Sequence, residues 1–261
     1  MVNKVHLLKC GKINMDQSVL LAGRGYGTRR VCPVFAFLLE TTEGYVLVDT
    51  GLIEEGVDSP ETAWGPRAKL LQPLMTHEDG ITARIAEHGV SPENIRMVIN
   101  THMHWDHTGG NKKFANAVFV EQRSEYRFAF EPDSSIGASY MQNHYSKDAN
   151  YQLVEGDCEV AEGIRVIQTP GHTPGHQSVV VTLSNGKGLI IAGDAVYHKD
   201  NLKHMIPPGN CYSQEHALLS LNKLKSISEL TGYPVIPSHD YDPDFTESIE
   251  AIVESINNGK Q

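Results

Sequence analysis

The sequence predicts an α/β protein in which two β-sheets are flanked by helices, within one domain that spans residues 1–261. Segments with strand patterns fall into two groups along the chain, and helical segments follow each group. No short repeat and no low-complexity linker divides the sequence. With 40% hydrophobic and 21% charged residues, a chain of this length can bury a sizeable core. Two sheets covered by helices accommodate this order of elements in a single domain.

Strand patterns dominate the first half of the chain. Apolar and polar residues alternate over 4–8, and apolar runs at 34–39 and 45–48 are separated by a short polar turn, which predicts a hairpin. Residues 51–79 follow no regular period, as expected of a long functional loop. Ile81 and Ile85 lie four positions apart and predict a helix, which ends at Gly89. A short apolar strand follows at 96–100.

The second half continues with strands and three helices. Strands are predicted at 118–120, 151–154, 164–168, 177–183, 188–192 and 234–237, and helices at 121–130, 213–230 and 244–256. The Ser-Asn-Gly turn at 184–186 predicts a hairpin between two of these strands. Ser213 is a suitable N-cap, and leucines at three-residue and four-residue spacings continue its helix.

The composition excludes several classes of function. Lys+Arg 22 against Asp+Glu 32 gives a net charge of −10, which argues against nucleic acid as a partner. No apolar run approaches the ~20 residues of a membrane helix, and the first residues lack the apolar core of a signal peptide. The four cysteines stand singly, as is usual in a reducing compartment. We therefore expect a cytoplasmic protein that binds neither a membrane nor nucleic acid.

Histidine is unusually frequent, with 13 residues, and its arrangement indicates a metal site. His102, His104, Asp106 and His107 place four potential ligands in six residues, directly after a predicted strand. Residues two apart in an extended chain point to the same side, so the first two can reach one cation and the last two, beyond a bend, a second cation. A lone histidine is more often a packing residue, but this group would be costly to bury without a cation. Imidazole with carboxylate, and no cysteine near, is typical of a catalytic site.

Three further candidate ligands each follow a predicted strand. They are His172 in a Pro-Gly-His turn, Asp194 in Ala-Gly-Asp and His239 in Pro-Ser-His. Each position is weak evidence when taken alone. Their order along the chain, combined with the cluster at 102–107, is much more specific.

This order resembles the metallo-β-lactamase superfamily, and the resemblance extends from residue 34 to about residue 240. It implies an αββα sandwich with a dinuclear site in the cleft between the edges of the two sheets. Within that site it implies that His102, His104 and His172 bind one metal, that Asp106, His107 and His239 bind the other, and that Asp194 bridges them. Asp49, in a Val-Asp-Thr-Gly strand end, would orient ligand histidines through hydrogen bonds. The implied cofactors are two divalent ions per chain, with zinc first and iron or cobalt as alternatives.

Residues after the bridging aspartate resemble one branch of this superfamily. Tyr197, three positions after Asp194, matches a tyrosine that N-acyl homoserine lactonases turn toward their metals. The stretch TPGHTPGHQS at 169–178 is also similar to the lactonase form. The resemblance implies a quorum-quenching enzyme that opens the lactone ring of N-acyl homoserine lactones, and it leaves a homodimer open. Trp105 departs from the branch, in which phenylalanine is familiar at that position.

The implied reaction assigns roles to a few residues. Two cations can lower the pKa of a shared water from ~15.7 toward ~7 and so supply hydroxide at neutral pH. Asp106 would transfer the proton, and Tyr197 would donate a hydrogen bond to the developing oxyanion. The acyl tail requires an apolar wall, which we expect from Trp105 and from the long loop at 51–79. The loop residues in question are Trp64, Leu70, Leu71 and Met75.

Other functions fit the same ligands less well. The main alternative is another ester or lactone hydrolase on the same dinuclear site, chiefly a hydroxyacyl-glutathione thioesterase. Against the thioesterase, only 261 − 239 = 22 residues follow His239, too few for its helical substrate domain. A mononuclear iron dioxygenase acting on persulfides would not need the complete second ligand set. A non-catalytic metal-binding protein is disfavoured by the open ligand set, and an RNA-processing nuclease by the net charge of −10.

Overall fold

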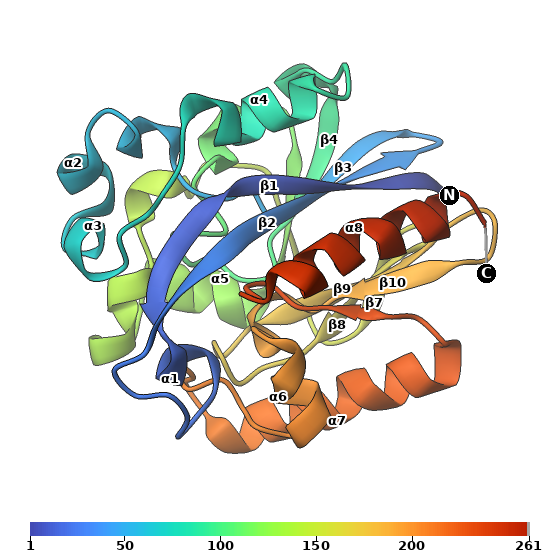
Figure 1. Ribbon diagram of the computed structural model, residues 1–261. Helices are drawn as coiled ribbons and strands as arrows, with labels where there is room; N and C mark the ends of the chain where they lie inside the picture. Colours follow the sequence, from blue (N-terminus) through green and yellow to red (C-terminus); the bar gives the residue numbers. More distant parts are fainter. Residues whose placement is uncertain (260–261) are drawn as a thin grey trace.

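The computed structural model describes residues 1–259 and contains two β-sheets between layers of helices (Figure 1). The first sheet has the order β1-β2-β3-β4-β5-β6, and the second has the order β11-β10-β9-β8-β7. The strands of the first sheet are β1 (Val2–Asp16), β2 (Arg29–Thr41), β3 (Gly44–Val48), β4 (Ile95–Ile99), β5 (Val118–Gln122) and β6 (Tyr151–Val154). Those of the second are β7 (Cys158–Ala161), β8 (Ile164–Gln168), β9 (Gln177–Thr182), β10 (Gly188–Ile191) and β11 (Val235–Ile236).

Eight α-helices and seven 3-10 turns connect and cover the strands in the described part of the chain. The helices are α1 (Gln17–Leu20), α2 (Pro60–Trp64), α3 (Arg67–Leu70), α4 (Ile81–Ala86), α5 (Arg123–Phe130), α6 (Lys199–His204), α7 (Gln214–Thr231) and α8 (Pro243–Asn257). The 3-10 turns are η1 (Glu54–Gly56), η2 (His77–Asp79), η3 (Pro92–Asn94), η4 (Asn111–Lys113), η5 (Ser134–Ser139), η6 (Gln142–His144) and η7 (Gly193–Ala195). Among residues 1–259, no helix combines the length and the apolar character needed to cross a bilayer.

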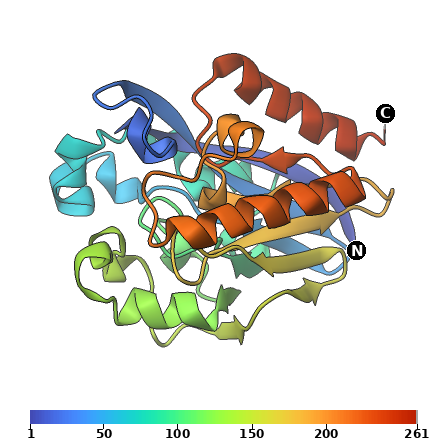
Figure 2. The ribbon, with the colours of Figure 1, turned by 90° about the horizontal axis from the view of Figure 1, so that it is seen from below.

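The main core lies between the two sheets. Phe35, Phe37 and Leu39 of β2 alternate with outward-facing residues, and they pack in one cluster with Val179 and Val181 of β9. Helix α8 contributes Ile249, Val253 and Ile256 to the same cluster, and it lies beside β1 along the open edge of the sandwich (Figures 1 and 2). The apolar residues of α8 recur at helical spacing, so one face of this helix closes the core.

Helices also cover the two outer faces of the sandwich. Ile81 and Ile85 of α4 pack in a cluster with Leu38 and Leu47 on the outer face of the first sheet. Leu221 and Leu224 of α7 pack on Ile190 of the second sheet. Figure 2 shows α7 lying over the strands of this sheet. The layers are therefore helix, sheet, sheet and helix, as the αββα expectation requires.

Most predicted elements are confirmed, and the differences have local causes. Ser213 caps α7 as expected, because its hydroxyl accepts a hydrogen bond from the His216 amide. The helix predicted from residue 121 begins at Arg123, because Glu121 and Gln122 pair with β6 and belong to β5. Strand β7 and helices α1 and α6 were not predicted, since their four to six residues carry little periodic signal. The loop at 51–79 holds the short helices α2 and α3.

The backbone of the turn after the histidine cluster packs directly against the backbone of residues 51–53. The Gly109 amide donates to the carbonyl oxygen of Gly51, and a Cβ on Gly109 would lie only 2.1 Å from the backbone nitrogen of Ile53. A side chain at this position would therefore separate the segment at 102–110 from the segment at 51–53. By contrast, a Cβ on Gly156 meets no atom within 4 Å, although the φ of Gly156 is +73°.

These two glycines give a matched test of this packing. We expect Gly109→Ala to destabilise the protein by about 3 kcal/mol or more, because the methyl group overlaps fixed backbone atoms. Gly156→Ala should cost only about 1–2 kcal/mol, from its left-handed backbone alone. Thermal melts followed by circular dichroism measure both effects, and equal decreases in Tm would contradict the proposed close approach.

Candidate metal centre

The candidate ligands meet at one edge of the sandwich because they follow strands that run in the same direction. Strands β3 and β4 are parallel neighbours, and Asp49 and the 102–107 segment follow their carboxyl ends. Strands β10 and β11 are also parallel, and β8 points the same way because β9 is antiparallel to both β8 and β10. His172, Asp194 and His239 therefore leave the second sheet at one edge, where the first sheet presents its own cluster.

Three histidines converge on a first position. His172 Nε2 lies 3.2 Å from His102 Nε2 and 2.9 Å from His104 Nδ1. His172 Nδ1 lies 2.6 Å from the Asn210 carbonyl oxygen and must donate to it, which leaves a lone pair on Nε2. Because the Thr101 hydroxyl donates to Asp49, its oxygen accepts from His102 Nδ1, which leaves the Nε2 of His102 as an acceptor too. A cation placed between these nitrogen atoms would use the inward-facing lone pairs of His102 and His172.

Two further histidines converge on a second position. His107 Nδ1 lies 2.8 Å from Asp49 Oδ2, and His239 Nδ1 lies 2.7 Å from the Pro33 carbonyl oxygen. Both rings therefore turn Nε2 inward. Asp106 Oδ2 is 3.6 Å from His239 Nε2 and 4.0 Å from His107 Nε2. These three side chains form the second group whose ligand atoms lie close together.

Asp194 lies between the two groups and presents one carboxylate oxygen to each. Its Oδ2 is 3.3 Å from His172 Nε2 and 3.7 Å from His102 Nε2. Its Oδ1 is 3.2 Å from His107 Nε2 and 3.3 Å from His239 Nε2. A carboxylate placed in this way can bridge two cations.

Burial and charge at the site have opposite effects on the histidines of the two groups. Burial lowers the pKa of His102 and His104 well below the usual value, and neighbouring imidazoles lower it further. Burial would also lower the pKa of His107, but the carboxylates of Asp194 and Asp49 raise it well above the usual value. Burial would raise the pKa of Asp194, but the imidazoles of His107, His239 and His172 hold it well below its usual range. The centre therefore presents the neutral imidazoles of His102 and His104 on one side of the ionised Asp194 carboxylate. On the other side, around His107, it strongly attracts positive charge.

The donor set fits two divalent cations. The seven candidate ligands are at most 7% exposed. His107 Nε2, His239 Nε2 and Asp194 Oδ1 are buried and make no hydrogen bond of normal geometry within the described part of the chain. Buried polar atoms without partners are costly, and a cation would satisfy all three. Imidazole and carboxylate donors suit zinc, iron and cobalt.

Asp49 orients the ligands from behind. Its Oδ1 accepts from the Thr101 amide at 2.7 Å, and its Oδ2 accepts from the Thr101 hydroxyl and from His107. Asp49 adopts a left-handed backbone, with φ of 60°, which turns its carboxylate toward the neighbouring strand end. One buried carboxylate thus fixes the His107 ring directly and the His102 ring through Thr101.

Tyr197 lies against the candidate ligands. Its ring stacks on His239 with centroids 5.2 Å apart, and its hydroxyl lies near the side chains of Asp194 and Asn210. Burial, followed by the charge of Asp194, raises the pKa of Tyr197 well above its usual value. The phenol is therefore protonated and can act as a hydrogen-bond donor.

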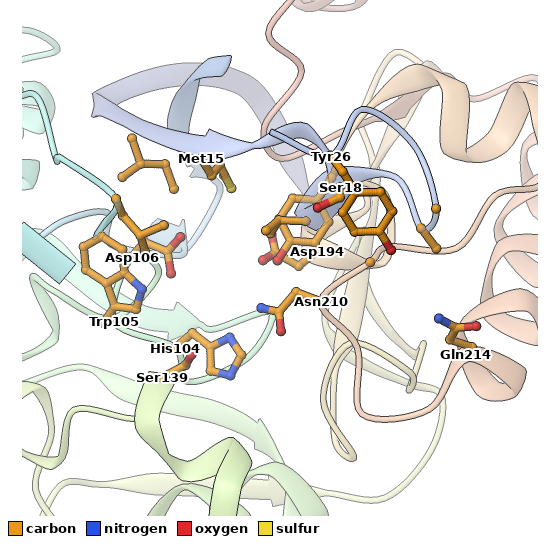
Figure 3. Close-up of a pocket in the computed structure, with 17 residues that line it drawn as sticks. Met15, Ser18, Tyr26, His104, Trp105, Asp106, Ser139, Asp194, Asn210 and Gln214 are labelled. Carbon is orange, nitrogen blue, oxygen red and sulfur yellow. The ribbon is translucent and has the colours of Figure 1, made fainter. Parts of the chain in front are cut away.

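A cleft of ≈ 390 Å³ opens beside the centre (Figure 3). His104, Asp106, Asp194 and Tyr197 form its polar floor. Its apolar lining consists of Ile13, Met15, Val19, Ala22, Leu71 and Trp105. Trp105 and Asp106 lie together on one side in Figure 3, and Tyr26 and Ser18 lie across the opening. The cleft thus combines a polar floor with an apolar wall.

The structure corrects the expected wall. Leu71 and Trp105 line the cleft, but Trp64, Leu70 and Met75 do not. Trp64 is 3% exposed and packs beneath Gly56, where a Cβ would lie 2.1 Å from the Trp64 ring, whereas Leu70 is 65% exposed. Met75 packs near Gly11, within β1. These three residues belong to the loop's own packing or to its surface.

Several residues that line the cleft were not predicted. Ile13 and Met15 end the long strand β1, Val19 lies in α1, and Tyr26 lies in the turn before β2. In the sequence they resemble ordinary strand and turn residues. Asn210 was also missed, although its carbonyl oxygen holds His172 and its side chain contacts Tyr197. Its position in a loop opposite a ligand-bearing turn gives no sequence signal.

Comparison with known proteins agrees with this geometry. Residues 29–239 match the metallo-beta-lactamase superfamily. An N-acyl homoserine lactonase of Bacillus cereus is 34% identical over 227 residues, which cover 87% of this chain and 88% of that protein. The N-acyl homoserine lactonase AiiA of Bacillus thuringiensis subsp. kurstaki is 32% identical and covers 92% of this chain and 94% of its own length.

Solved structures extend the similarity to the fold. An N-acyl homoserine lactone hydrolase with the product N-hexanoyl-L-homoserine bound at its catalytic metal centre aligns with a TM-score of 0.85. It is 31% identical, and the alignment covers 94% of this chain and 96% of that one. A mutant of AiiA from B. thuringiensis with N-decanoyl-L-homoserine at its active site also has a TM-score of 0.85, at 32% identity and the same coverage. The chain belongs to the metallo-β-lactamase superfamily, in the branch of the N-acyl homoserine lactonases.

Proposed function

We propose that this protein is a dinuclear metal-dependent hydrolase that opens the lactone ring of N-acyl homoserine lactones. One observation carries the proposal: a set of seven candidate ligands, with Asp194 between two groups, lies beside a cleft that is lined by His104, Asp106, Asp194 and Tyr197. The similarity to lactonases over most of the chain supports the choice of substrate. We propose zinc as the metal, with iron or cobalt as alternatives. A single domain, a cytoplasmic location and a homodimer stay predictions.

The residues of the centre divide the chemical work. His102, His104 and His172 would hold one cation, Asp106, His107 and His239 the other, and Asp194 would contact both. When bound, two such cations supply a hydroxide nucleophile at neutral pH and attract the oxygen atoms of the lactone ester. No serine or cysteine nucleophile is then required.

Tyr197 would stabilise the negative charge that develops on the lactone carbonyl oxygen. Its hydroxyl is protonated, buried at the floor of the cleft and adjacent to Asp194. A donor that is already fixed in place is worth more than water, because it need not reorganise as the charge forms. The hydroxyl would turn from the Asp194 carboxylate to the substrate oxygen and donate a hydrogen bond to it.

Asp106 would transfer the proton. Its Oδ2 faces the histidines of the second group, and the residue also lines the cleft. Its Oδ1 could take the proton released when water attacks and return it to the ring oxygen as that oxygen leaves. The product would be the ring-opened N-acyl homoserine.

The first prediction from this proposal is two metal ions per chain. Elemental analysis of protein purified without chelator should give this ratio, because one cation would use only four or five of the seven ligands. Asp194→Ala should lower metal content and turnover more than His102→Ala or His239→Ala, because Asp194 contacts both positions. A ratio of one that does not rise when metal is added would contradict the dinuclear centre.

The second prediction concerns Tyr197→Phe. We expect kcat to fall by about 10²- to 10³-fold, as for the loss of one oxyanion donor, although nearby metals could reduce the effect. Metal content should not change, since the hydroxyl is not among the seven ligands. Turnover equal to that of the wild type would return Tyr197 to a packing role.

The third prediction concerns the acyl chain. Each buried methylene contributes at most ~0.8 kcal/mol, so chains of eight carbons could bind up to ~3 kcal/mol more tightly than chains of four. We expect KM to fall with chain length while kcat changes less, because contacts with the tail are equal in the ground and transition states. Trp105→Ala should weaken this dependence, whereas Leu70→Ala, which alters an exposed residue outside the cleft, should not.

The control substrate for this series is a glutathione thioester, assayed by proton release on the same metal-loaded sample. Hydrolysis of the thioester without hydrolysis of any lactone would replace the lactonase proposal with the thioesterase alternative. An equal effect of Trp105→Ala and Leu70→Ala on the dependence of KM on chain length would contradict the wall described here.

A further inference from the structure

Glu125 is a fully buried carboxylate that receives four hydrogen bonds. It lies in the first turn of α5 and is 0% exposed. Its Oε1 accepts from the Met103 amide at 2.9 Å and from the Tyr140 hydroxyl at 2.9 Å. Its Oε2 accepts from the Thr173 hydroxyl at 2.6 Å and from the Gly175 amide at 3.2 Å. Burial raises the pKa of Glu125, and all four donors oppose this rise.

These donors connect the carboxylate to both segments that carry the first group of histidines. Met103 stands between His102 and His104, and Thr173 directly follows His172. The second segment also packs tightly against α5, since a Cβ on Gly175 would lie 2.1 Å from the Glu125 backbone nitrogen. One side chain therefore holds together two loops from different sheets.

We infer that Glu125 is a positioning residue: it fixes the distance between these two loops, and thereby sets the affinity of the cation that His102, His104 and His172 would hold. This inference rests on the proposed dinuclear centre. It adds a residue that contacts neither metal nor substrate and acts through the backbone of the ligand loops.

The arrangement of donors makes a carboxylate necessary at this position. Each oxygen of Glu125 receives one backbone N–H, which cannot turn away, and one hydroxyl, which can. A glutamine has one oxygen and one NH2 group. In either orientation its NH2 group would face a backbone N–H, of Met103 or of Gly175. That loop must then move or leave a buried donor without a partner.

The second group of ligands is anchored elsewhere. His107 is held by Asp49, and its carbonyl oxygen accepts from the Thr50 amide at 2.8 Å. His239 is held by the Pro33 carbonyl oxygen. None of these anchors contacts Glu125. A change at Glu125 should therefore weaken one cation position more than the other, which distinguishes positioning from a general loss of stability.

Glu121 provides a matched control. It is also 0% exposed and lies in β5, four residues before Glu125 in the sequence, but neither of its oxygens has a hydrogen-bond partner in the described part of the chain. Burial, with the nearby carboxylates of Glu125 and Asp49, raises the pKa of Glu121 well above its usual value, which favours its uncharged form. Glu121→Gln places an uncharged side chain of the same shape at this position.

The experiment measures each cation position separately. His239→Ala keeps the first ligand group intact, and His104→Ala keeps the second. Zinc is titrated into the metal-free form of each protein in competition with a chromophoric chelator, and the unaltered chain is titrated in parallel. In the His239→Ala background, Glu125→Gln should raise the Kd for zinc about 10- to 100-fold, as expected for loss of a residue that orients ligands. In the His104→Ala background the Kd should stay within about twofold.

In the same titration, Glu121→Gln should leave the Kd for zinc unchanged in both backgrounds. Thr173→Val removes one hydroxyl donor to Glu125 and places no NH2 group against a backbone N–H. In the His239→Ala background it should raise the Kd for zinc by less than Glu125→Gln does. If Glu125→Gln does not fold, Thr173→Val decides the question. An unchanged Kd, or an equal rise in both backgrounds, would overturn the inference for Glu125. Failure of the unaltered chain to bind zinc would instead overturn the dinuclear centre itself.

Discussion

The structure depends on one electrostatic constraint: a buried, ionised aspartate surrounded by imidazoles whose lone pairs face one another. Asp194 is 1% exposed and lies within 3.7 Å of nitrogen atoms of His102, His107, His172 and His239. A cluster of acceptors in a medium of low dielectric constant is unfavourable unless positive charge lies within it. Because the ligands come from both sheets, binding of cations there would also stabilise the fold.

The hydrogen bonds behind the ligands connect this constraint to the rest of the molecule. Each of four histidines uses its second nitrogen to contact a different part of the chain: Thr101 for His102, Asp49 for His107, Asn210 for His172 and Pro33 for His239. These partners lie in β2 or next to β3, β4 and α7, so the orientation of the rings depends on how both sheets pack. The geometry of the centre is therefore a property of the whole sandwich rather than of the 102–107 cluster alone.

The candidate ligands could be identified from the sequence because their signal is local and chemical. Packing alone rarely places four donors within six residues, and His172, Asp194 and His239 each follow an apolar strand. The supporting residues had no such signal. Glu125 looks like an ordinary polar residue in a helix, and Ile13 and Met15 look like core residues of a strand. Their roles depend on which segments the fold brings together, and a single sequence does not encode that locally.

The apolar composition of the loop does not predict which of its residues line the cleft. Leu70 and Leu71 are adjacent and equally apolar, yet only Leu71 lines the cleft. The Asn14 amide donates to the Leu71 carbonyl oxygen at 2.6 Å, and the Lys12 amide donates to Leu74 at 2.8 Å, so this part of the loop is attached to the end of β1. This pairing turns Leu71 toward Ile13 and Met15 and leaves Leu70 in solvent. The loop contributes to the cleft through its backbone register against β1. Substitutions in the loop or in β1 would therefore alter the wall. The candidate ligands would keep their positions, because they are anchored at other strand ends.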